Sequence, residues 1–228
     1  MRKLLLSLLL TGCVVNAHAD IKQLAIKYPK LKFEDIQATE LKGIYSATMD
    51  GQVVYLDEAG EHVMLGSMIR LKDQKNLTKD LVVNANRISW KDLPLNQAIK
   101  TVKGNGQHQI AIFSDPNCPY CQKLEKELDQ LNNVTVYTFL YPIQTVSILP
   151  SKQVWCSSSP SYTWQNLIRR HIQPPQNSSC ENPIQQNLNL GKKLGIDGTP
   201  GIIFSNGFKS TGFISKTDIE AVWKEYGI

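Results

Sequence analysis

The sequence predicts an α+β protein in which a β-rich N-terminal domain is followed by a helical linker and a larger domain of mixed strands and helices. Two observations carry this prediction. Strand-like runs flank an Asp50-Gly51 turn in the first third of the chain, and a strand-helix-strand order begins at His108. The 228 residues are 42% hydrophobic and 20% charged, which suits one or two globular domains.

Residues 1–19 have the features of a secretory signal. Arg2 and Lys3 form a basic start, an apolar stretch runs from Leu4 to about Val15, and Ala17-His18-Ala19 is a cleavage site of small residues. We expect cleavage after Ala19 and export of a soluble product.

A competing interpretation of the same segment is a lipoprotein. Leu10-Thr11-Gly12-Cys13 resembles a lipoprotein box, which would leave a lipidated Cys13 as the first residue. The soluble product is favoured because the apolar stretch continues past Cys13. No other apolar run approaches the roughly eighteen residues of a membrane span.

The charge balance argues against a nucleic-acid partner. The net charge is +5, of which Arg2 and Lys3 contribute two, leaving +3 on the exported chain. A net charge this small indicates an ordinary solvated surface.

Residues 20–76 are predicted to form the N-terminal domain. A short amphipathic helix from Ile21 to Tyr28 is followed by a hairpin of strands 44–49 and 52–56, since Asp-Gly between alternating runs is a strong hairpin signal. Further strand-like runs cover 62–65 and 67–71. A β-meander of this size cannot bury a large hydrophobic core by itself. We therefore expect the domain to dimerise through an edge strand.

Residues 77–104 are predicted to be a helical linker. The clearer helix begins at Asp92 and ends at Gly104, with apolar Leu95, Ala98, Ile99 and Val102 at helical spacing. The preceding stretch is less helical because it contains Val82 and Val83, which are poor helix formers.

Residues 105–228 are predicted to form the second domain. The order is strand 108–114, helix 118–132, strand 134–140, a helical insertion at about 152–194, strands 201–204 and 208–211, and a final helix 215–226. This order is the thioredoxin arrangement.

Two cysteines open the helix that follows strand 108–114. Cys118 and Cys121 are separated by two residues, and a cysteine in such a motif at a helix N-terminus titrates at roughly 3.5 to 7.5 instead of about 8.5. We therefore expect Cys118 to be a nucleophile and Cys121 the resolving thiol. Half of a zinc site is disfavoured, since no second close pair accompanies them. A static disulfide is disfavoured because two cysteines three apart on a helix turn make a strained, reducible bridge.

The other cysteines predict a structural disulfide. Cys13 lies in the signal, which leaves four, an even number in an exported chain. With Cys118 and Cys121 placed together, Cys156 pairs with Cys180, which stabilises the fold by about 3 kcal/mol in the chain-entropy model. A second redox centre is the alternative, although neither cysteine lies in a CxxC motif.

The Gly198-Thr199-Pro200-Gly201 turn precedes the last two strands, where thioredoxin-like proteins carry a cis-proline facing the reactive cysteines. We expect Thr199 and Pro200 to bind the backbone of a client peptide and Tyr120 to shape the surface beside the sulfurs. His62, His108 and His171 are scattered, so we assign them no role. No metal or cofactor is expected.

These pieces together resemble the DsbC/DsbG family of periplasmic protein disulfide isomerases over nearly the full exported length. The matching pieces are Phe113-Ser114-Asp115 before the Cys118 motif, Trp155-Cys156 with Cys180, Gly198-Thr199-Pro200, and the meander of 43–71 followed by a linker. The Pro119-Tyr120 dipeptide is that of the DsbG branch, whereas the Cys156 and Cys180 pair resembles DsbC, so the branch stays open.

The resemblance implies a cystatin-like N-terminal dimerisation domain, a linker helix and a thioredoxin-like catalytic domain. It also implies a periplasmic homodimer whose two active sites face an apolar cleft and are kept reduced by a membrane reductant of the DsbD type. The clients would be unfolded or misoxidised exported proteins.

The predicted function is thiol:disulfide interchange, isomerising or reducing non-native disulfides through Cys118 and Cys121. Two alternatives remain: a net thiol oxidase of the DsbA kind, and a periplasmic holdase chaperone whose cysteines are secondary. The redox state of Cys118 and Cys121 separates isomerase from oxidase, and suppression of aggregation without either cysteine would indicate a holdase.

Overall fold

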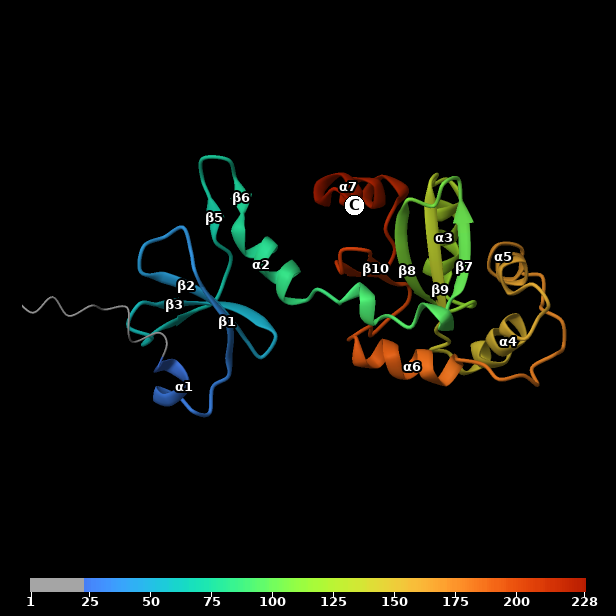
Figure 1. The fold of residues 1–228 in the computed structure, drawn as a ribbon, viewed down its shortest axis with the longest axis horizontal. Coiled ribbons are helices and arrows are strands. Elements are labelled where there is room, and N and C mark those ends of the chain that lie inside the picture. The colour runs from blue at the N-terminus through green and yellow to red at the C-terminus, as the bar shows by residue number, and fades with distance from the viewer. Residues whose placement is uncertain (1–22) are drawn as a thin grey trace, which may run out of the picture. The chain divides into compact units, whose positions relative to one another are not determined.

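The fold is described for residues 23–228 of a computed structural model, so the predicted signal and its cleavage site lie outside the described residues. The chain forms two compact units, one ending at Ala85 and the other beginning at Asn86 (Figure 1). Among residues 23–228, none of the helices has both the length and the apolar character that crossing a membrane requires.

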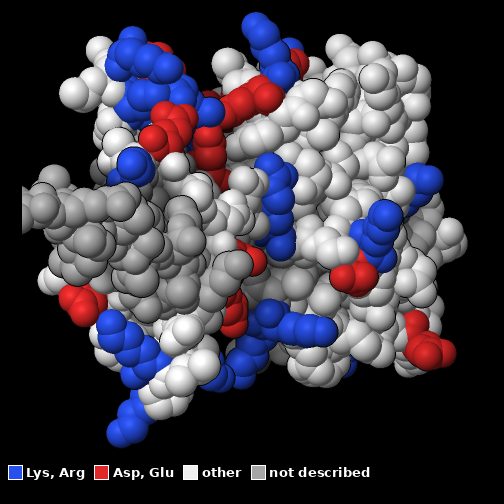
Figure 2. All heavy atoms as spheres, turned by 60° about the vertical axis from the view of Figure 1, so that its left-hand side comes forward, with Lys and Arg blue, Asp and Glu red and all other residues white. Residues whose placement is uncertain are grey.

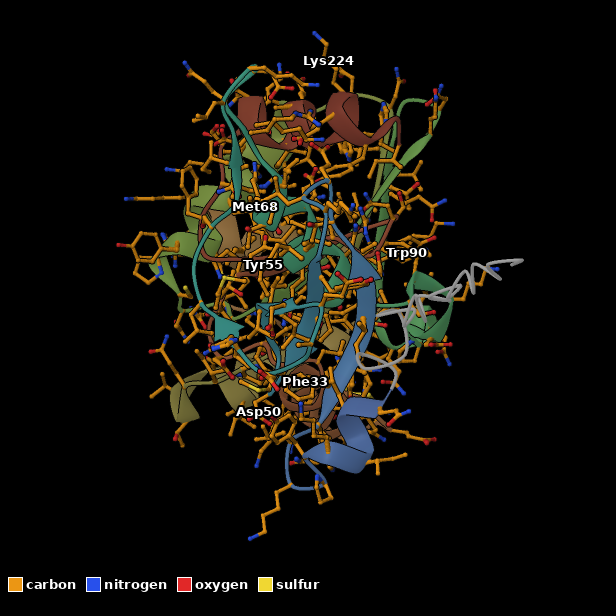
Figure 3. The ribbon with its side chains drawn as sticks, turned by 90° about the vertical axis from the view of Figure 1, so that its left-hand side faces the viewer. Phe33, Asp50, Tyr55, Met68, Trp90 and Lys224 are labelled. Carbon is orange, nitrogen blue, oxygen red and sulfur yellow. A yellow bond between two sulfur atoms is a disulfide. The ribbon has the colours of Figure 1, made fainter. Side chains whose placement is uncertain are left out.

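The first unit contains a four-stranded antiparallel sheet with the order β1-β2-β3-β4. Its strands are β1 (Phe33–Ala38), β2 (Ile44–Met49), β3 (Gln52–Asp57) and β4 (Val63–Met64). Asp50 and Gly51 have φ angles of 51° and 78°, the left-handed values that a tight hairpin turn needs, so the predicted hairpin is confirmed. Phe33 pairs with Met49 beside this turn (Figure 3).

Helices α1 (Leu24–Lys27) and α2 (Leu77–Ala85) of the first unit contact this sheet, and a separate two-stranded ribbon precedes α2. The first helix, α1, is shorter than predicted, and the ribbon of β5 (Ile69–Arg70) and β6 (Lys75–Asn76) leads into α2. Thr78 in α2 is hydrogen-bonded to the Tyr55 hydroxyl of β3 and accepts the backbone N–H of Met68 at 2.7 Å.

The second unit is built on a five-stranded sheet with the order β11-β10-β8-β9-β7. Its strands are β7 (Ile99–Lys103), β8 (His108–Ser114), β9 (Val134–Leu140), β10 (Gly201–Phe204) and β11 (Lys209–Thr211). β8 and β9 are parallel, and the other neighbours are antiparallel. The predicted thioredoxin-like arrangement is confirmed.

Helices cover both faces of the sheet. The helices of this unit are α3 (Pro119–Asp129), α4 (Thr145–Trp155), α5 (Pro160–Arg170), α6 (Ile184–Lys193) and α7 (Lys216–Tyr226). Ile110 and Ile112 pack with residues of α3 and α7, whereas Ala111 and Phe113 pack with the segment around α6. β8 is thus buried on both faces, and its C-terminal end is held rigidly.

The predicted helix from Asp92 to Gly104 is wrong. Two short 3-10 turns, Trp90–Asp92 and Leu95–Gln97, are followed by the edge strand β7, which pairs with β9. The β-branched residues Ile99, Thr101 and Val102 favour a strand, and Val102, which was assigned to the apolar helix face, is exposed. Only α2 of the predicted linker is an α-helix.

The helical insertion begins earlier than predicted, at Thr145, because Pro150 is accommodated inside α4. The stretch between α5 and α6 carries Cys180 and has no regular structure. A disulfide joins Cys180 to Cys156 at the C-terminal end of α4.

Acidic and basic side chains lie intermixed on the face drawn in Figure 2. In the first unit, Arg70 pairs with Asp73 at 2.7 Å and Lys75 pairs with Asp80 at 2.9 Å. The two charges of each pair offset one another.

Candidate active site

Cys118 lies at the N-cap of α3, directly after the turn that ends β8. Pro119 follows at the first helical position, where its missing N–H costs nothing because that group has no partner within the helix. The Cys118 sulfur therefore lies where the unpaired N–H groups and the dipole of α3 favour an anion.

Cys121 lies one turn further along α3 and is more deeply buried. Both cysteines are free thiols, with 7% of Cys118 and 1% of Cys121 exposed. Because Cys118 is the more exposed of the two, it can attack an external disulfide. Cys121 can react only with a disulfide already formed at Cys118.

The Thr199-Pro200 turn lies directly beside Cys118. Gly201 pairs with Phe113, so the register of β10 against β8 brings this turn to the C-terminal end of β8, just before the cysteines. The Thr199-Pro200 peptide bond is cis, and the Cys118 thiol donates a hydrogen bond to the Thr199 carbonyl over 3.3 Å. A side chain at position 201 would meet Ile196 at 2.4 Å, so glycine is needed there.

Burial raises the pKa of Cys121 to about 12, although hydrogen bonds with the Ser114 side chain and the Asp115 backbone oppose the shift. Negative charge on Cys118 raises this pKa further. Cys121 therefore stays protonated near neutral pH, and it becomes reactive only when its proton is removed.

We expect Cys121 to resist alkylation when it is the only active-site thiol. In Cys118→Ser, the rate of reaction with iodoacetamide at pH 9 should be at least about tenfold below that of a free cysteine, because the thiolate is the reactive form. The rate should still be rising at pH 10, which mass spectrometry of the alkylated protein would measure. An alkylation rate that stops rising below pH 9 would contradict the raised pKa of Cys121.

A buried carboxylate fixes the turn that carries Cys118. Asp115 accepts the backbone N–H groups of Asn117 at 2.8 Å and Gln144 at 3.0 Å, and also the hydroxyl of Ser147. The Asn117 amide donates to Ser147 at 2.9 Å. These bonds join the active-site turn to the first turn of α4.

Comparison with known proteins identifies the two units. Residues 15–79 match the family described as the disulfide bond isomerase protein N-terminal domain, and residues 95–227 match the thioredoxin-like domain. The chain is 34% identical over 195 residues to the probable thiol:disulfide interchange protein DsbC of Bordetella pertussis, covering 83% of this chain and 70% of the relative. This chain belongs to the DsbC family of thiol:disulfide interchange proteins.

Further comparisons agree with this assignment. The DsbC of Salmonella typhimurium is 26% identical over 220 residues, covering 92% of this chain and 90% of the relative. The crystal structure of a disulfide interchange protein from Neisseria gonorrhoeae is 34% identical and superimposes with a TM-score of 0.55, covering 58% of this chain and 97% of that one. As a DsbC-family member the chain is a thiol-disulfide oxidoreductase, and these curated relatives carry the DsbC name, not DsbG.

Tyr120 lies in the first turn of α3 and is 57% exposed, with the Lys123 ammonium 5.4 Å from its ring centroid. Its side chain therefore belongs to the surface beside Cys118. Among residues 23–228, no three His, Cys, Asp or Glu side chains are grouped so as to hold a metal ion.

Sequence reasoning assigned no role to Asp115 or Glu125, the two buried acids near the cysteines. Glu125 lies one turn beyond Cys121, where its carboxylate accepts the Trp164 indole N–H at 2.8 Å and lies 3.5 Å from Arg169. Burial raises the pKa of Glu125. Asp115 had a detectable signal, an acid directly after an apolar strand, but Glu125 looked like an ordinary surface residue of a charged helix.

Proposed function

We propose that this DsbC-family protein isomerises or reduces non-native disulfides of exported proteins through Cys118 and Cys121. The observation that carries the proposal is the contact of the Cys118 thiol with the Thr199 carbonyl in a cis-proline turn. It places a nucleophile beside backbone groups that suit an extended peptide.

The reaction begins when the Cys118 thiolate attacks one sulfur of a client disulfide. A new bond joins Cys118 to that sulfur, and the other client sulfur leaves as a thiolate. A second client thiolate then displaces Cys118, which completes isomerisation with no net electron transfer. If instead Cys121 loses its proton and attacks Cys118, the client leaves as a dithiol and the enzyme becomes oxidised.

Thr199 and Pro200 are proposed to bind the client backbone, and Tyr120 to border it. Cys118 in a mixed disulfide has no proton to donate, so the Thr199 carbonyl becomes free to accept a backbone N–H of the client. Pro200 lacks an N–H, so its nitrogen cannot donate to a neighbouring strand of the protein at this edge.

We further propose a homodimer formed by the first unit. β4 ends its sheet. Its residue Met64 is 41% exposed, and Leu65, which follows the strand, is 70% exposed. They line an apolar hollow of about 300 Å³ with Leu41, Ile44, Tyr55, Gly66, Ser67 and Met68. Tyr55 and Met68 are labelled in Figure 3. An exposed edge strand with apolar residues is suited to pairing with a second copy.

The dimer can be tested with Met64→Glu/Leu65→Glu. Two charges per copy in an apolar interface should shift the protein from dimer to monomer in sedimentation at micromolar concentration, because unpaired charges resist burial. Val82→Glu/Ile26→Glu, at exposed positions outside the hollow, is the matched control. A wild-type protein that sediments as a monomer would refute the dimer.

The proposed compartment is the periplasm, with cleavage near Ala19 and a lipid anchor at Cys13 as the lesser alternative. A membrane reductant of the DsbD type would return oxidised Cys118 and Cys121 to thiols, since isomerisation needs a free Cys118. The proposed clients are unfolded or misoxidised exported proteins.

The activity is tested with two substrates, a protein with scrambled disulfides and a client whose cysteines are reduced. Reduced enzyme should restore activity to a protein with scrambled disulfides, whereas oxidised enzyme should not do so at a comparable rate. The DsbA-like alternative predicts the opposite preference, with oxidised enzyme forming disulfides in a reduced client. If the protein only prevents aggregation in both assays, the holdase alternative is correct.

A further inference from the structure

Cys121 must lose a proton before it can resolve a mixed disulfide at Cys118. Only 1% of Cys121 is exposed, and burial raises its pKa to about 12. A client joined to Cys118 also covers the N-terminal end of α3, so solvent reaches this side least at the moment when the proton leaves. A proton acceptor inside the fold would still be available in that state.

Glu125 lies one helical turn beyond Cys121 in α3. Residues four apart in a helix lie on the same face, with about 5–6 Å between their Cβ atoms, and only 6% of Glu125 is exposed. Asp115 is the other acid that is buried among residues 23–228. Its carboxylate already accepts three donors, two backbone N–H groups and the Ser147 hydroxyl. Glu125 is therefore the better placed proton acceptor.

The surroundings of Glu125 and Cys121 overlap. Trp164 and Leu140 belong to the buried cluster that contains Cys121. The Trp164 indole N–H also donates to the Glu125 carboxylate at 2.8 Å. Thr138, two residues before Leu140 in β9 and on the same face of the sheet, lines a small cavity with Glu125. The carboxylate and the thiol thus lie at neighbouring positions between α3, α5 and the sheet.

Charged groups connect Glu125 to solvent at the other end of α3. The Glu125 carboxylate is 3.5 Å from the Arg169 guanidinium, which pairs with Asp129 at 2.8 Å. The Asp129 side chain is 54% exposed and ends α3, whereas Cys118 precedes its first residue. The cavity that Glu125, Lys103 and Arg169 line has about 10 Å³, roughly the space of one water molecule. A proton on Glu125 can thus reach solvent away from the bound client.

We propose that Glu125 is the base that accepts the proton of Cys121 when Cys121 resolves a mixed disulfide. The inference rests on the proposed function and deepens one of its two routes. The Cys121 S–H bond breaks and its proton passes to the Glu125 carboxylate. The Cys121 sulfur then attacks the Cys118 sulfur, a bond forms between them, and the client sulfur leaves as a thiolate. Glu125 returns its proton to solvent.

This role concerns net reduction alone. In isomerisation a client thiolate displaces Cys118, so Cys121 keeps its proton and Glu125 is not needed. Glu125 therefore sets how often the enzyme reduces a client disulfide instead of rearranging it. Burial raises the pKa of Glu125, which brings this carboxylate closer to the neutral range where a general base is most effective.

The first test follows reduced enzyme after mixing with oxidised glutathione at pH 7, with acid quenching and mass spectrometry of the intact protein. Glu125→Gln should form the glutathione adduct at Cys118 within about twofold of the wild-type rate. It should resolve the adduct at least about tenfold more slowly, because general base catalysis typically contributes that much or more. The glutamine keeps an oxygen for the Trp164 N–H, which preserves the packing.

The same variant should separate the two activities on a protein client. Its isomerisation of scrambled disulfides should stay within about twofold of wild type, whereas its net reduction of a client disulfide should fall by about tenfold. A substitution that merely loosened the fold would lower both rates.

The pH profile of resolution gives a readout that packing alone does not move. The β9 side of the cavity is uncharged, and the charged or titratable groups that face Glu125 are Lys103 of β7, Arg169 of α5, and Asp129 and Cys121 of α3. The wild-type rate should level off above the pKa of Glu125, because the carboxylate is then ionised. In Glu125→Gln the rate should instead rise about tenfold per pH unit up to pH 9, since hydroxide must remove the proton.

Two further variants separate a base from a packing role. Glu125→Asp keeps the carboxylate but shortens the side chain, so it should resolve the adduct faster than Glu125→Gln, whereas a packing role predicts the reverse order. Glu127→Gln is the matched control, with the same substitution in the same helix at a residue that is not buried, and should match wild type.

Wild-type resolution kinetics in Glu125→Gln, or an equal loss of adduct formation and resolution, would overturn the inference. Circular dichroism checks the fold. If Glu125→Gln is unfolded, the pH profiles of wild type and Glu125→Asp decide, since a wild-type rate that never levels off would exclude the carboxylate as the base. A wild type that forms no adduct with oxidised glutathione would refute the proposed function itself.

Discussion

Replacing Cys118 with serine is expected to lower the rate of disulfide exchange by about a thousandfold or more, since the hydroxyl is not ionised near neutral pH and the nucleophile is lost. Cys121 cannot substitute for it, because 1% of Cys121 is exposed and burial raises its pKa to about 12. The measurement is the refolding rate of a scrambled client with stoichiometric reduced enzyme.

Cys121→Ser is the matched control for this prediction. It keeps the attacking thiol, so a mixed disulfide between Cys118 and the client should form and persist, visible as a higher-mass band that dithiothreitol removes. If Cys118→Ser refolds the client at the wild-type rate, or if Cys121→Ser forms no such adduct, the assigned roles of the two cysteines are wrong.

Replacing Asp115 with alanine should be the most damaging change outside the cysteines. It leaves three donors without their acceptor, the N–H groups of Asn117 and Gln144 and the Ser147 hydroxyl. At about 1 kcal/mol or more for each unsatisfied buried group, the free energy of unfolding should fall by about 3 kcal/mol. Chemical denaturation followed by tryptophan fluorescence would measure it.

The same variant should lower the exchange rate by about tenfold under conditions where it is folded, because the turn that carries Cys118 loses its anchor to α4. Ser147→Ala removes one of the three donors, and should cost about 1 kcal/mol with a smaller loss of rate. An Asp115→Ala protein as stable and active as wild type would show that this network does not position Cys118.

The sequence predicted the central strands and the cysteine-bearing helix because their local signals agree. β8, β9 and β10 are apolar, β-branched runs bounded by turns, and α3 follows a CxxC motif at its N-cap. β7 was missed because Leu95, Ala98, Ile99 and Val102 also fit a helical spacing. Its pairing with β9 determines the strand, and β9 lies far along the chain.

Two other features depend on tertiary structure. β1 is an exposed edge strand interrupted by an irregularity near Asp35, where φ is 52°, so no clean alternation marks it. The Asp115 network joins residues about thirty positions apart, and only the folding of β8 beside β9 brings Ser147 to Asp115.

The proposed isomerase function is tested most directly by the redox state of the cysteines in the periplasm of cells that make the protein. Acid quenching followed by alkylation with a mass-shifting maleimide would count the free thiols on a gel. We predict a two-thiol shift from Cys118 and Cys121 in most molecules, with Cys156 and Cys180 remaining a disulfide. A population in which Cys118 and Cys121 are mostly unmodified, and gain two thiols only after reduction at the active site, would contradict an isomerase and indicate an oxidase.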